Sequence, residues 1–593
     1  RSEESSFRWK ISLTEKLVKI REKGGISMLN GSSEFVSMLL PVGALTLPVE
    51  GAHSCTTILV GKAATVDGSV LMATSCDGNI MGRIYKLPAK EYRKDAKVRM
   101  FYDFPAPSTW EEHEDQPKRG YTFVGYLPIE QTYHCILAAG HLADSVTGGI
   151  NEHCLSMGIE YMGMKPELVN RKGIVSTCSN HWTTSLIANG LMRAKTAREA
   201  IHLMGSMVEK YGFTYYWAPA AGCAIPVVDK KEAWIMEIFG PGGNWTPGSG
   251  KPGAVWCAQR VPDGEVTCNA NRSRIGEVDP LSPDDFMASP NIYSLAEELG
   301  LWKPGRPFIW YEVYGTTGGR ANSLREWAAL NSHAPSLGLE ATGDPKTDRY
   351  PFSVKPDRRV SVQALTSVMR DYYQGTQFDV TEYPPFNPGG KKSLLARPFG
   401  SRDLFDLVGI EPERCIGSET SGYVYISQIR DWLPDPISGC LWFTLGPSFT
   451  SCFAPVYSGV TEIAESWSRR PNFTRIDLTQ VQWKFQLVGD LTGLKYQEAI
   501  KDVREVFESA EERFLALQTE LEDAAVHVFR KYGSARAERF VTEYTNSCLK
   551  NVDNAYGELV DYLMFKYLHS YSDVAPPKLT GVSTPTVPAL PTN

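Results

Sequence analysis

The residue with the clearest chemical potential is Cys55, which opens the segment "CTTILVGKAATVDGSVLMATSCDG" ending at Gly78. A thiol at a newly formed chain end stands beside its own α-amine. The ordinary pKa of this amine is about 8, so part of the amine is neutral at neutral pH. Such an amine accepts the thiol proton, so one residue supplies both nucleophile and base. The chemistry also needs donors for an oxyanion and a carboxylate to hold the ammonium. Cys55 is therefore a candidate nucleophile if the chain is cleaved before it.

The segment before Cys55 has the features of a removable leader. An apolar stretch over residues 35–54 ends in Ala52 and Ser54, which occupy the −3 and −1 positions that signal peptidase reads. We expect residues 1–54 to be a signal peptide or propeptide, removed by signal peptidase or by autoproteolysis. Together with four N-x-[ST] sequons, this leader predicts a secreted or lumenal protein.

The elements that must position Cys55 start with a hairpin. Two apolar, β-rich runs at 55–60 and 69–74 are separated by a segment that ends in Asp67-Gly68, which predicts a β-hairpin. A cysteine in such a strand is most often an inert core residue. The small-residue junction before Cys55 and its place at the start of the hairpin favour the nucleophile instead.

Further along the chain, strand and helix patterns occur in separate blocks. Residues 212–240 and 253–275 each predict a pair of strands, the second turning at Pro262-Asp263-Gly264. A capping box at Thr196–Glu199 begins a helix. Hairpins and segregated helices predict an α+β fold rather than a doubly wound one.

The pattern also predicts the domain organisation. We expect a catalytic domain with insertions over residues 55–495, and a helical region over 496–572 that packs on it. A Pro/Thr-rich tail follows at 573–593.

Composition and missing motifs exclude several classes of function. The net charge is −7, and no basic block indicates nucleic-acid binding. No apolar run is long enough to span a membrane. The sequence contains no CxxC pair, HExxH, GxSxG or Walker A motif, and its GxGxxG match at 248–253 lies in a Pro/Gly-rich loop and opens no helix.

Several blocks in order carry a resemblance to a known family. The opening segment resembles the start of the cysteine N-terminal-nucleophile (Ntn) dipeptidases, the dipeptidase A family that includes the secernins, distantly related to bile salt hydrolases and penicillin V acylases. The similarity extends from Cys55 to roughly Ser570. It continues through "GGINEHCLSMGIE" (148–160), "RAKTAREAI" (193–201), "VVDKKEAWIMEI" (227–238), "RVPDGEVTCNANRSRIGEVD" (260–279) and "WLPDPISGCLWFTLG" (432–446).

This resemblance implies an αββα sandwich with further loops, and it implies site residues. Asp77 matches the carboxylate that contacts the nucleophile's amine, and Asn151 matches the asparagine that helps to bind the oxyanion. Asn271 matches a second polar group near the site, and Arg260 an arginine near the nucleophile. Thr74 departs from the basic residue that relatives often carry there, which leaves Arg260 or another cation as a candidate to support the thiolate.

Each of these residues also has a structural explanation. Asp77 precedes a glycine and fits a turn, and Asn151 fits a turn or a helix cap. Asn271 lies in a sequon and cannot be both a glycan acceptor and a buried site residue. Arg260, taken alone, is most simply a surface charge.

The function expected from the resemblance is hydrolysis of dipeptides through a thioester on Cys55, with a small peptide as substrate. The resemblance implies no metal or other cofactor. We expect no nucleic-acid partner and no membrane span, and the sequence leaves open whether the protein forms a homo-oligomer. One alternative is an amidase or acyltransferase of the same fold that acts on N-acyl substrates. A second alternative is a non-catalytic binding or structural protein that retains its leader.

Overall fold

A computed structural model describes residues 55–78, 81–103, 121–140, 145–177, 182–214, 221–399, 402–472 and 474–568. The predicted leader and tail lie outside these residues, so both stay predictions. Among the described helices, none combines the length and the apolar character needed to cross a membrane.

Cys55 lies two residues before a strand of a seven-stranded sheet whose strands pair in antiparallel fashion. The predicted hairpin forms its centre, with Thr57 opposite Thr74. In spatial order the strands are β17 (Ser353–Val354), β15 (Val266–Asn269), β1 (Thr57–Val60), β2 (Val70–Asp77), β18 (Ser421–Ile429), β19 (Gly439–Leu445) and β20 (Ala454–Tyr457).

A second, nine-stranded antiparallel sheet holds the predicted strand pair around Asp229. β11 (Glu160–Gly163) pairs with β12 off the main path of this sheet. Along that path the strands are β16 (Phe286–Ala288), β14 (Val255–Val261), β13 (Ala233–Phe239), β12 (Ala221–Val228), β10 (Ser156–Met157), β9 (Ser145–Asn151), β8 (Cys135–Gly140) and β3 (Arg83–Leu87). Two small ribbons pair β4 (Lys90–Glu91) with β7 (Gln131–Thr132), and β5 (Lys97–Asp103) with β6 (Tyr121–Pro128).

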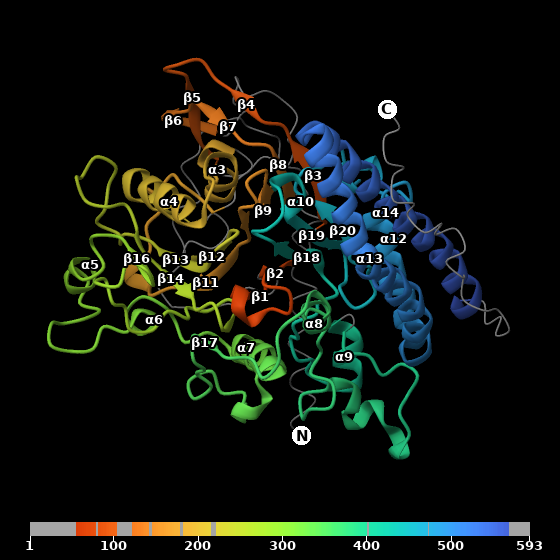
Figure 1. Cartoon of the computed structure of the whole chain (residues 1–593). Helices are drawn as coiled ribbons and strands as arrows, with labels where there is room; N and C mark the ends of the chain where they lie inside the picture. The colour runs from red at the N-terminus through yellow and green to blue at the C-terminus, as the bar shows by residue number, and fades with distance from the viewer. Residues whose placement is uncertain are drawn as a thin grey trace, which may run out of the picture. The chain divides into compact units, whose positions relative to one another are not determined.

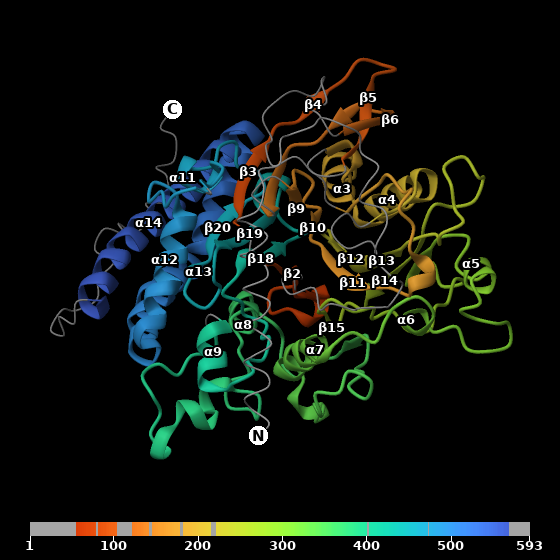
Figure 2. The same ribbon diagram turned by 180° about the vertical axis from the view of Figure 1, so that it is seen from behind.

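The two sheets face each other and each carries helices on its outer face (Figure 1). α3 (Leu186–Arg193) and α4 (Ala197–Tyr211) pack on the nine-stranded sheet. α12 (Val481–Thr492), α13 (Tyr496–Tyr532) and α14 (Ser534–Leu563) pack on the seven-stranded sheet, as Figure 2 shows from behind. The molecule is therefore an α+β protein, as the segregated patterns predict.

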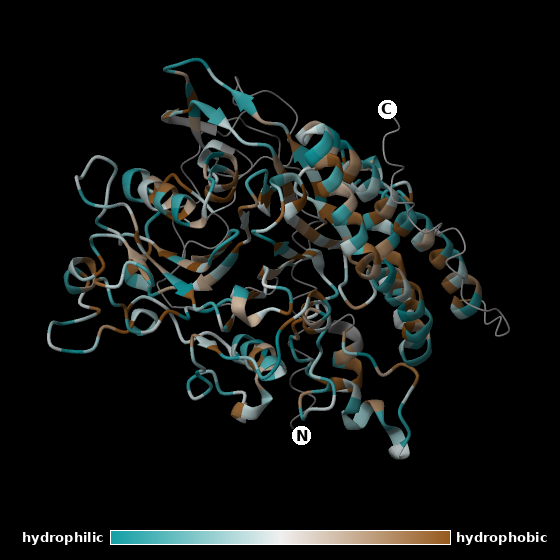
Figure 3. Ribbon diagram, viewed as in Figure 1, coloured by the Kyte–Doolittle hydropathy of each residue, from teal (hydrophilic) through white to brown (hydrophobic). Residues whose placement is uncertain are grey.

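The long helices at the end of the described chain follow the predicted helical spacing. α13 buries Val503, Val506, Phe507, Phe514 and Leu521, and most of its charged residues lie on other sides. The buried Glu511 is an exception and pairs with Arg370. Figure 3 shows hydrophobic and hydrophilic residues side by side along these helices. Burial of that apolar stripe against the sheet stabilises the helices far more than intrinsic propensity does.

One predicted strand pair is wrong. β14 and β15 flank the predicted turn, yet β14 lies in the nine-stranded sheet and β15 in the seven-stranded sheet. The turn at Pro262–Glu265 instead carries the chain from one sheet to the other. Turn residues between two apolar runs indicate a reversal of direction, but they do not specify the partner of each strand.

The remaining described α-helices lie in the segment that follows β15, and all of them except α7 have seven residues or fewer. They are α5 (Ser294–Glu298), α6 (Trp310–Val313), α7 (Arg320–His333), α8 (Val362–Val368), α9 (Arg402–Val408), α10 (Asp435–Ser438) and α11 (Glu465–Ser468).

Candidate active site

Cys55 lies two residues before β1, and its side chain faces the space between the two sheets. Thr57 and Thr74 are opposite each other and their hydroxyl oxygens are 3.0 Å apart, so they share one face of the sheet. Tyr425 is opposite Thr74 and reaches across to Met157 O in the nine-stranded sheet. Because side chains alternate along a strand, Cys55 lies on the same inward face as Thr57.

The thiol of Cys55 is almost completely buried, with 4% of the residue exposed. Contact with the thiol of Cys76 and then burial raise its pKa well above the ordinary value, and the negative charge of Asp77 acts in the same direction. A hydrogen bond from the backbone of Asp77 opposes this shift by stabilising the thiolate. The structure thus places Cys55 beside the end of β2.

Asp77, the last residue of β2, accepts hydrogen bonds on both carboxylate oxygens. Ser421 Oγ donates to Oδ1 at 2.5 Å, and Ser75 Oγ donates to Oδ2 at 2.7 Å. Arg414 Nη2 forms an ion pair with Oδ2 at 2.6 Å. Ser75 Oγ also accepts from Thr56 N at 3.0 Å, which links this carboxylate to the residue after Cys55. Asp77 is 1% exposed and is held rigidly next to the start of β1.

A buried arginine that sequence reasoning missed holds the backbone of Cys55. Arg325 lies on α7, and its Nη1 donates to Cys55 O at 2.6 Å and to Thr56 Oγ1 at 2.9 Å. Its Nη2 donates to Asn271 Oδ1 at 3.0 Å. Burial, followed by the nearby charge of Arg414, lowers the pKa of the Arg325 guanidinium. One guanidinium therefore joins the candidate nucleophile to Asn271.

Asn271 lies in a tight, buried turn after β15. Its φ of 66° is in the left-handed region, which asparagine tolerates better than most residues. Its amide nitrogen donates one hydrogen to Tyr161 O at 2.9 Å, and the residue is 5% exposed. Its backbone N–H donates to Glu160 Oε2 at 3.2 Å, and burial raises the pKa of that carboxyl to about 8. These contacts use Asn271 inside the fold, where a glycan has no room.

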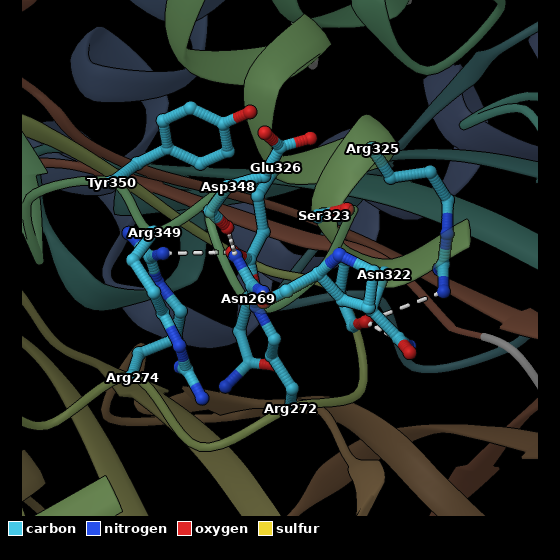
Figure 4. A network of polar contacts seen from close by, with 12 residues as sticks. Asn269, Arg272, Arg274, Asn322, Ser323, Arg325, Glu326, Asp348, Arg349 and Tyr350 are labelled. Carbon is cyan, nitrogen blue, oxygen red and sulfur yellow. Dashed lines mark hydrogen bonds and ion pairs between the residues drawn. The ribbon is translucent and has the colours of Figure 1, made fainter. Parts of the chain in front are cut away.

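The turn that carries Asn271 is fixed to α7 by a buried ion-pair cluster (Figure 4). Glu326 Oε2 is 2.5 Å from Arg272 Nη2 and 2.7 Å from Arg274 Nη1, and all three side chains are at most 1% exposed. Arg272 also donates to Asp348 O at 2.6 Å. Glu326 is next to Arg325 in the sequence, so this cluster sets the position of the helix from which Arg325 reaches Cys55.

Asn151 does not lie with this group. It is opposite Cys135, whose side chain belongs to the core between the nine-stranded sheet and helices α3 and α4. Its Nδ2 donates to Leu191 O at 2.8 Å and to Ala194 O at 2.7 Å. Its Oδ1 accepts from the backbone N–H groups of two residues in the following turn, His153 and Leu155. A primary amide has two hydrogens, so no donor remains for an oxyanion in this arrangement.

Arg260 also lies away from Cys55. It is on β14, where its Nε is 3.4 Å from Glu232 Oε2 and its Nη2 pairs with Asp263. Asp263 O accepts from Ala63 N, which places this group beyond the other end of β1. The cations near Cys55 are instead Arg325 and Arg414, which follow it by 270 and 359 residues in the sequence. No local spacing connects such distant positions, so only the folded structure brings them together.

A cavity of about 210 Å³ adjoins the site through Arg414. Aromatic and polar residues share its wall: Pro398, Phe399, Phe405, Glu413, Ser418, Thr420 and Phe449. Within the described residues, no group of three or more His, Cys, Asp or Glu side chains is arranged to hold a metal ion. The site consists of a thiol, a carboxylate, two guanidinium groups and an amide beside a small opening.

Comparison with known proteins gives the chemistry a family. The profile of peptidase family C69 matches residues 54–509 and thus starts next to Cys55. A protein of Lactobacillus helveticus named dipeptidase A is 25% identical over 446 residues, which cover 75% of this chain and 82% of that protein. A probable dipeptidase B of Lactococcus lactis is 24% identical over 515 residues, which cover 80% and 93% respectively. The family match covers most of the chain, and the chain therefore belongs to peptidase family C69 and is a peptidase.

Proposed function

We propose that this protein is an N-terminal-nucleophile cysteine dipeptidase in which Cys55 attacks the peptide bond. The observation that carries the proposal is the placement of Cys55 just before β1, beside Asp77 and with its carbonyl held by Arg325. The dipeptidase names of the relatives support dipeptides as substrates. Two antiparallel sheets enclosed by helices support the Ntn-hydrolase sandwich as the fold.

Activation requires cleavage of the bond between Ser54 and Cys55. While this bond is intact, the nitrogen of Cys55 is an amide and cannot act as a base. Hydrolysis of this bond would create an α-amine whose ordinary pKa is about 8. That amine would take the proton of the adjacent thiol. Asp77 lies where its carboxylate can hold the resulting ammonium. The start of the family match at residue 54 supports cleavage at this bond.

Catalysis would then proceed in two steps. The thiolate attacks the carbonyl carbon of the first residue of the dipeptide, a carbon–sulfur bond forms, and the carbonyl oxygen becomes an oxyanion. The C–N bond breaks as the ammonium of Cys55 protonates the departing amino acid, which leaves a thioester. Water, deprotonated by the same amine, attacks the thioester and releases the first amino acid with the thiol restored.

Asn271 takes the oxyanion role in this proposal. Its amide nitrogen donates one hydrogen to Tyr161 O, and its second hydrogen has no partner among the described residues. Arg325 fixes the amide oxygen of Asn271 and so orients the free N–H group. Preorganised donors of this kind stabilise the developing negative charge without rearrangement during the reaction.

The cavity next to Arg414 supports a short substrate. Its volume of about 210 Å³ provides room for a small molecule. Its aromatic wall, with Phe399, Phe405 and Phe449, suits an apolar side chain. We also propose a secreted or lumenal location, on the basis of the leader sequence.

Replacement of Cys55 tests the function. Cys55→Ala and Cys55→Ser should each abolish dipeptide hydrolysis, because alanine has no nucleophile and serine has a much weaker one. Cys268→Ala is a matched control, since it removes another buried thiol, from a strand next to β1. Each protein is assayed with dipeptides and with N-acyl amino acids, after its first residue is identified. Normal hydrolysis by Cys55→Ala would refute the proposal, and hydrolysis of N-acyl substrates alone would favour an amidase.

A further inference from the structure

A second thiol lies directly opposite the proposed nucleophile. Ser75 N donates to Thr56 O at 3.0 Å across the β1–β2 ladder. Hydrogen-bonded and non-hydrogen-bonded pairs alternate along an antiparallel ladder, so Cys55 and Cys76 form a non-hydrogen-bonded pair. In such pairs the Cα atoms are about 4.5 Å apart, which is within the range of about 4.4–6.8 Å that disulfides span.

The side chains of this pair also point to the same side. The preceding pair of the same face, Thr57 and Thr74, has its hydroxyl oxygens 3.0 Å apart. Cys55 and Cys76 follow on the same face, and the thiol of Cys76 is the first cause of the raised pKa of Cys55, so the two side chains are neighbours. The sheet therefore presents the two sulfur atoms to each other without any change in register.

The thiol pair lies mostly inside the fold, and Cys55 keeps a small exposed area. Cys55 is 4% exposed and Cys76 is 2% exposed. Tyr423 is opposite Cys76 on β18, and its hydroxyl donates to Thr147 Oγ1 at 2.8 Å. The proposed hydrolytic steps give Cys76 no task, although it touches the reacting atom.

We propose that Cys55 and Cys76 form a reversible disulfide that switches off the nucleophile under oxidising conditions. Formation of the disulfide depends only on the geometry of β1 and β2. Its effect on hydrolysis rests on the proposed function of Cys55.

Hydrogen peroxide is the oxidant class that balances the reaction. The Cys55 thiolate attacks one peroxide oxygen, the O–O bond breaks, and a sulfenic acid and hydroxide form. Cys76 then attacks the Cys55 sulfur, the S–O bond breaks, and its proton leaves with the hydroxide as water. Two thiols and one peroxide thus give one disulfide and two waters. A dithiol such as dithiothreitol returns both thiols by exchange.

Peptide mapping of the peroxide-treated protein tests the inference. The wild type, Cys76→Ala, Cys76→Ser and the control Cys268→Ala are treated with hydrogen peroxide, alkylated in denaturant and digested. We expect a cross-linked peptide that joins Cys55 to Cys76 in the wild type and the control. Dithiothreitol should restore their hydrolysis to the untreated level. In the Cys76 variants, Cys55 should proceed to the sulfinic acid, and dithiothreitol should not restore activity.

The outcomes separate this inference from the proposed function. If Cys55 of the wild type reaches the sulfinic acid as fast as in Cys76→Ala and no cross-link forms, the disulfide is refuted. If the cross-link forms but hydrolysis is unchanged, the disulfide stands and Cys55 is not the nucleophile. Mapping needs no activity, so it decides the first question even for a protein that hydrolyses no dipeptide.

Discussion

Separate replacement of two arginines by methionine tests which cation holds Cys55 in position. The resemblance predicts Arg260 as the cation near the nucleophile, whereas the structure places Arg325 there. Arg325→Met and Arg260→Met remove the same charge and keep an unbranched apolar side chain. Arg325→Met should damage hydrolysis and Arg260→Met should not.

The magnitude follows from the contacts of each guanidinium. Arg325 donates to the carbonyl oxygens of Cys55 at 2.6 Å and of Ala270 at 3.3 Å, and neither oxygen can rotate toward another donor. Each buried acceptor left unpaired costs about 1–3 kcal/mol, and removal of a buried charge offsets part of this cost. We therefore expect a loss of about 1–3 kcal/mol in the free energy of unfolding. A nucleophile displaced by about 1 Å loses about 10²-fold in rate.

Arg260 supplies the contrast. Its partners Glu232 and Asp263 are partly exposed, and such ion pairs contribute about 0–1 kcal/mol. Measurement of kcat/KM per folded molecule, with urea unfolding in parallel, separates the two effects. Rates for Arg325→Met within a few-fold of wild type would refute the reasoning, as would a hundredfold loss for Arg260→Met.

Three further predictions concern buried polar groups. Glu160 has a pKa of about 8 against an ordinary 4.5, so between these pH values the folded state holds a proton that the unfolded state has lost. As the pH rises from 4.5 to about 8, the free energy of unfolding should therefore fall by up to about 4–5 kcal/mol, at about 1.4 kcal/mol per pH unit. Glu160→Gln should remove this fall in urea titrations, and an unchanged pH slope would contradict it. Asn151→Ala should lower the free energy of unfolding by about 2–4 kcal/mol while folded enzyme keeps its rate; a rate loss of about 10²–10³-fold at unchanged stability would restore the oxyanion role. Glu326→Gln leaves Arg272 and Arg274 without their counter-charge and should cost about 3–5 kcal/mol, visible as a lower urea midpoint; an unchanged midpoint would show that the cluster does not fix α7.

Local patterns were sufficient for much of the fold. The hairpin from β1 to β2 has strong turn residues and adjacent apolar runs, so its two strands pair as predicted. The helices from Tyr496 onward have apolar residues at helical spacing along most of their buried face. The predicted pairing of β14 with β15 was wrong because the same turn residues suit both a hairpin and a passage between two sheets.

The site shows a similar division. Cys55 and Asp77 lie near each other because the two strands of one hairpin carry them. Arg325 was missed because α7 has no distinctive motif and reaches Cys55 only through tertiary packing. Asn151 was assigned through the resemblance, yet its strand register turns the side chain toward α3. Facing direction depends on register, which a motif alone does not specify.

The most direct test of the account is to trap the reaction on the protein. Purified enzyme is mixed with a dipeptide, quenched in acid during turnover and digested for mass spectrometry. We expect an N-terminal peptide that begins at Cys55 and carries the first residue of the dipeptide as an acyl group. Active enzyme in which Cys55 remains joined to Ser54, or in which the acyl group lies on another residue, would contradict it.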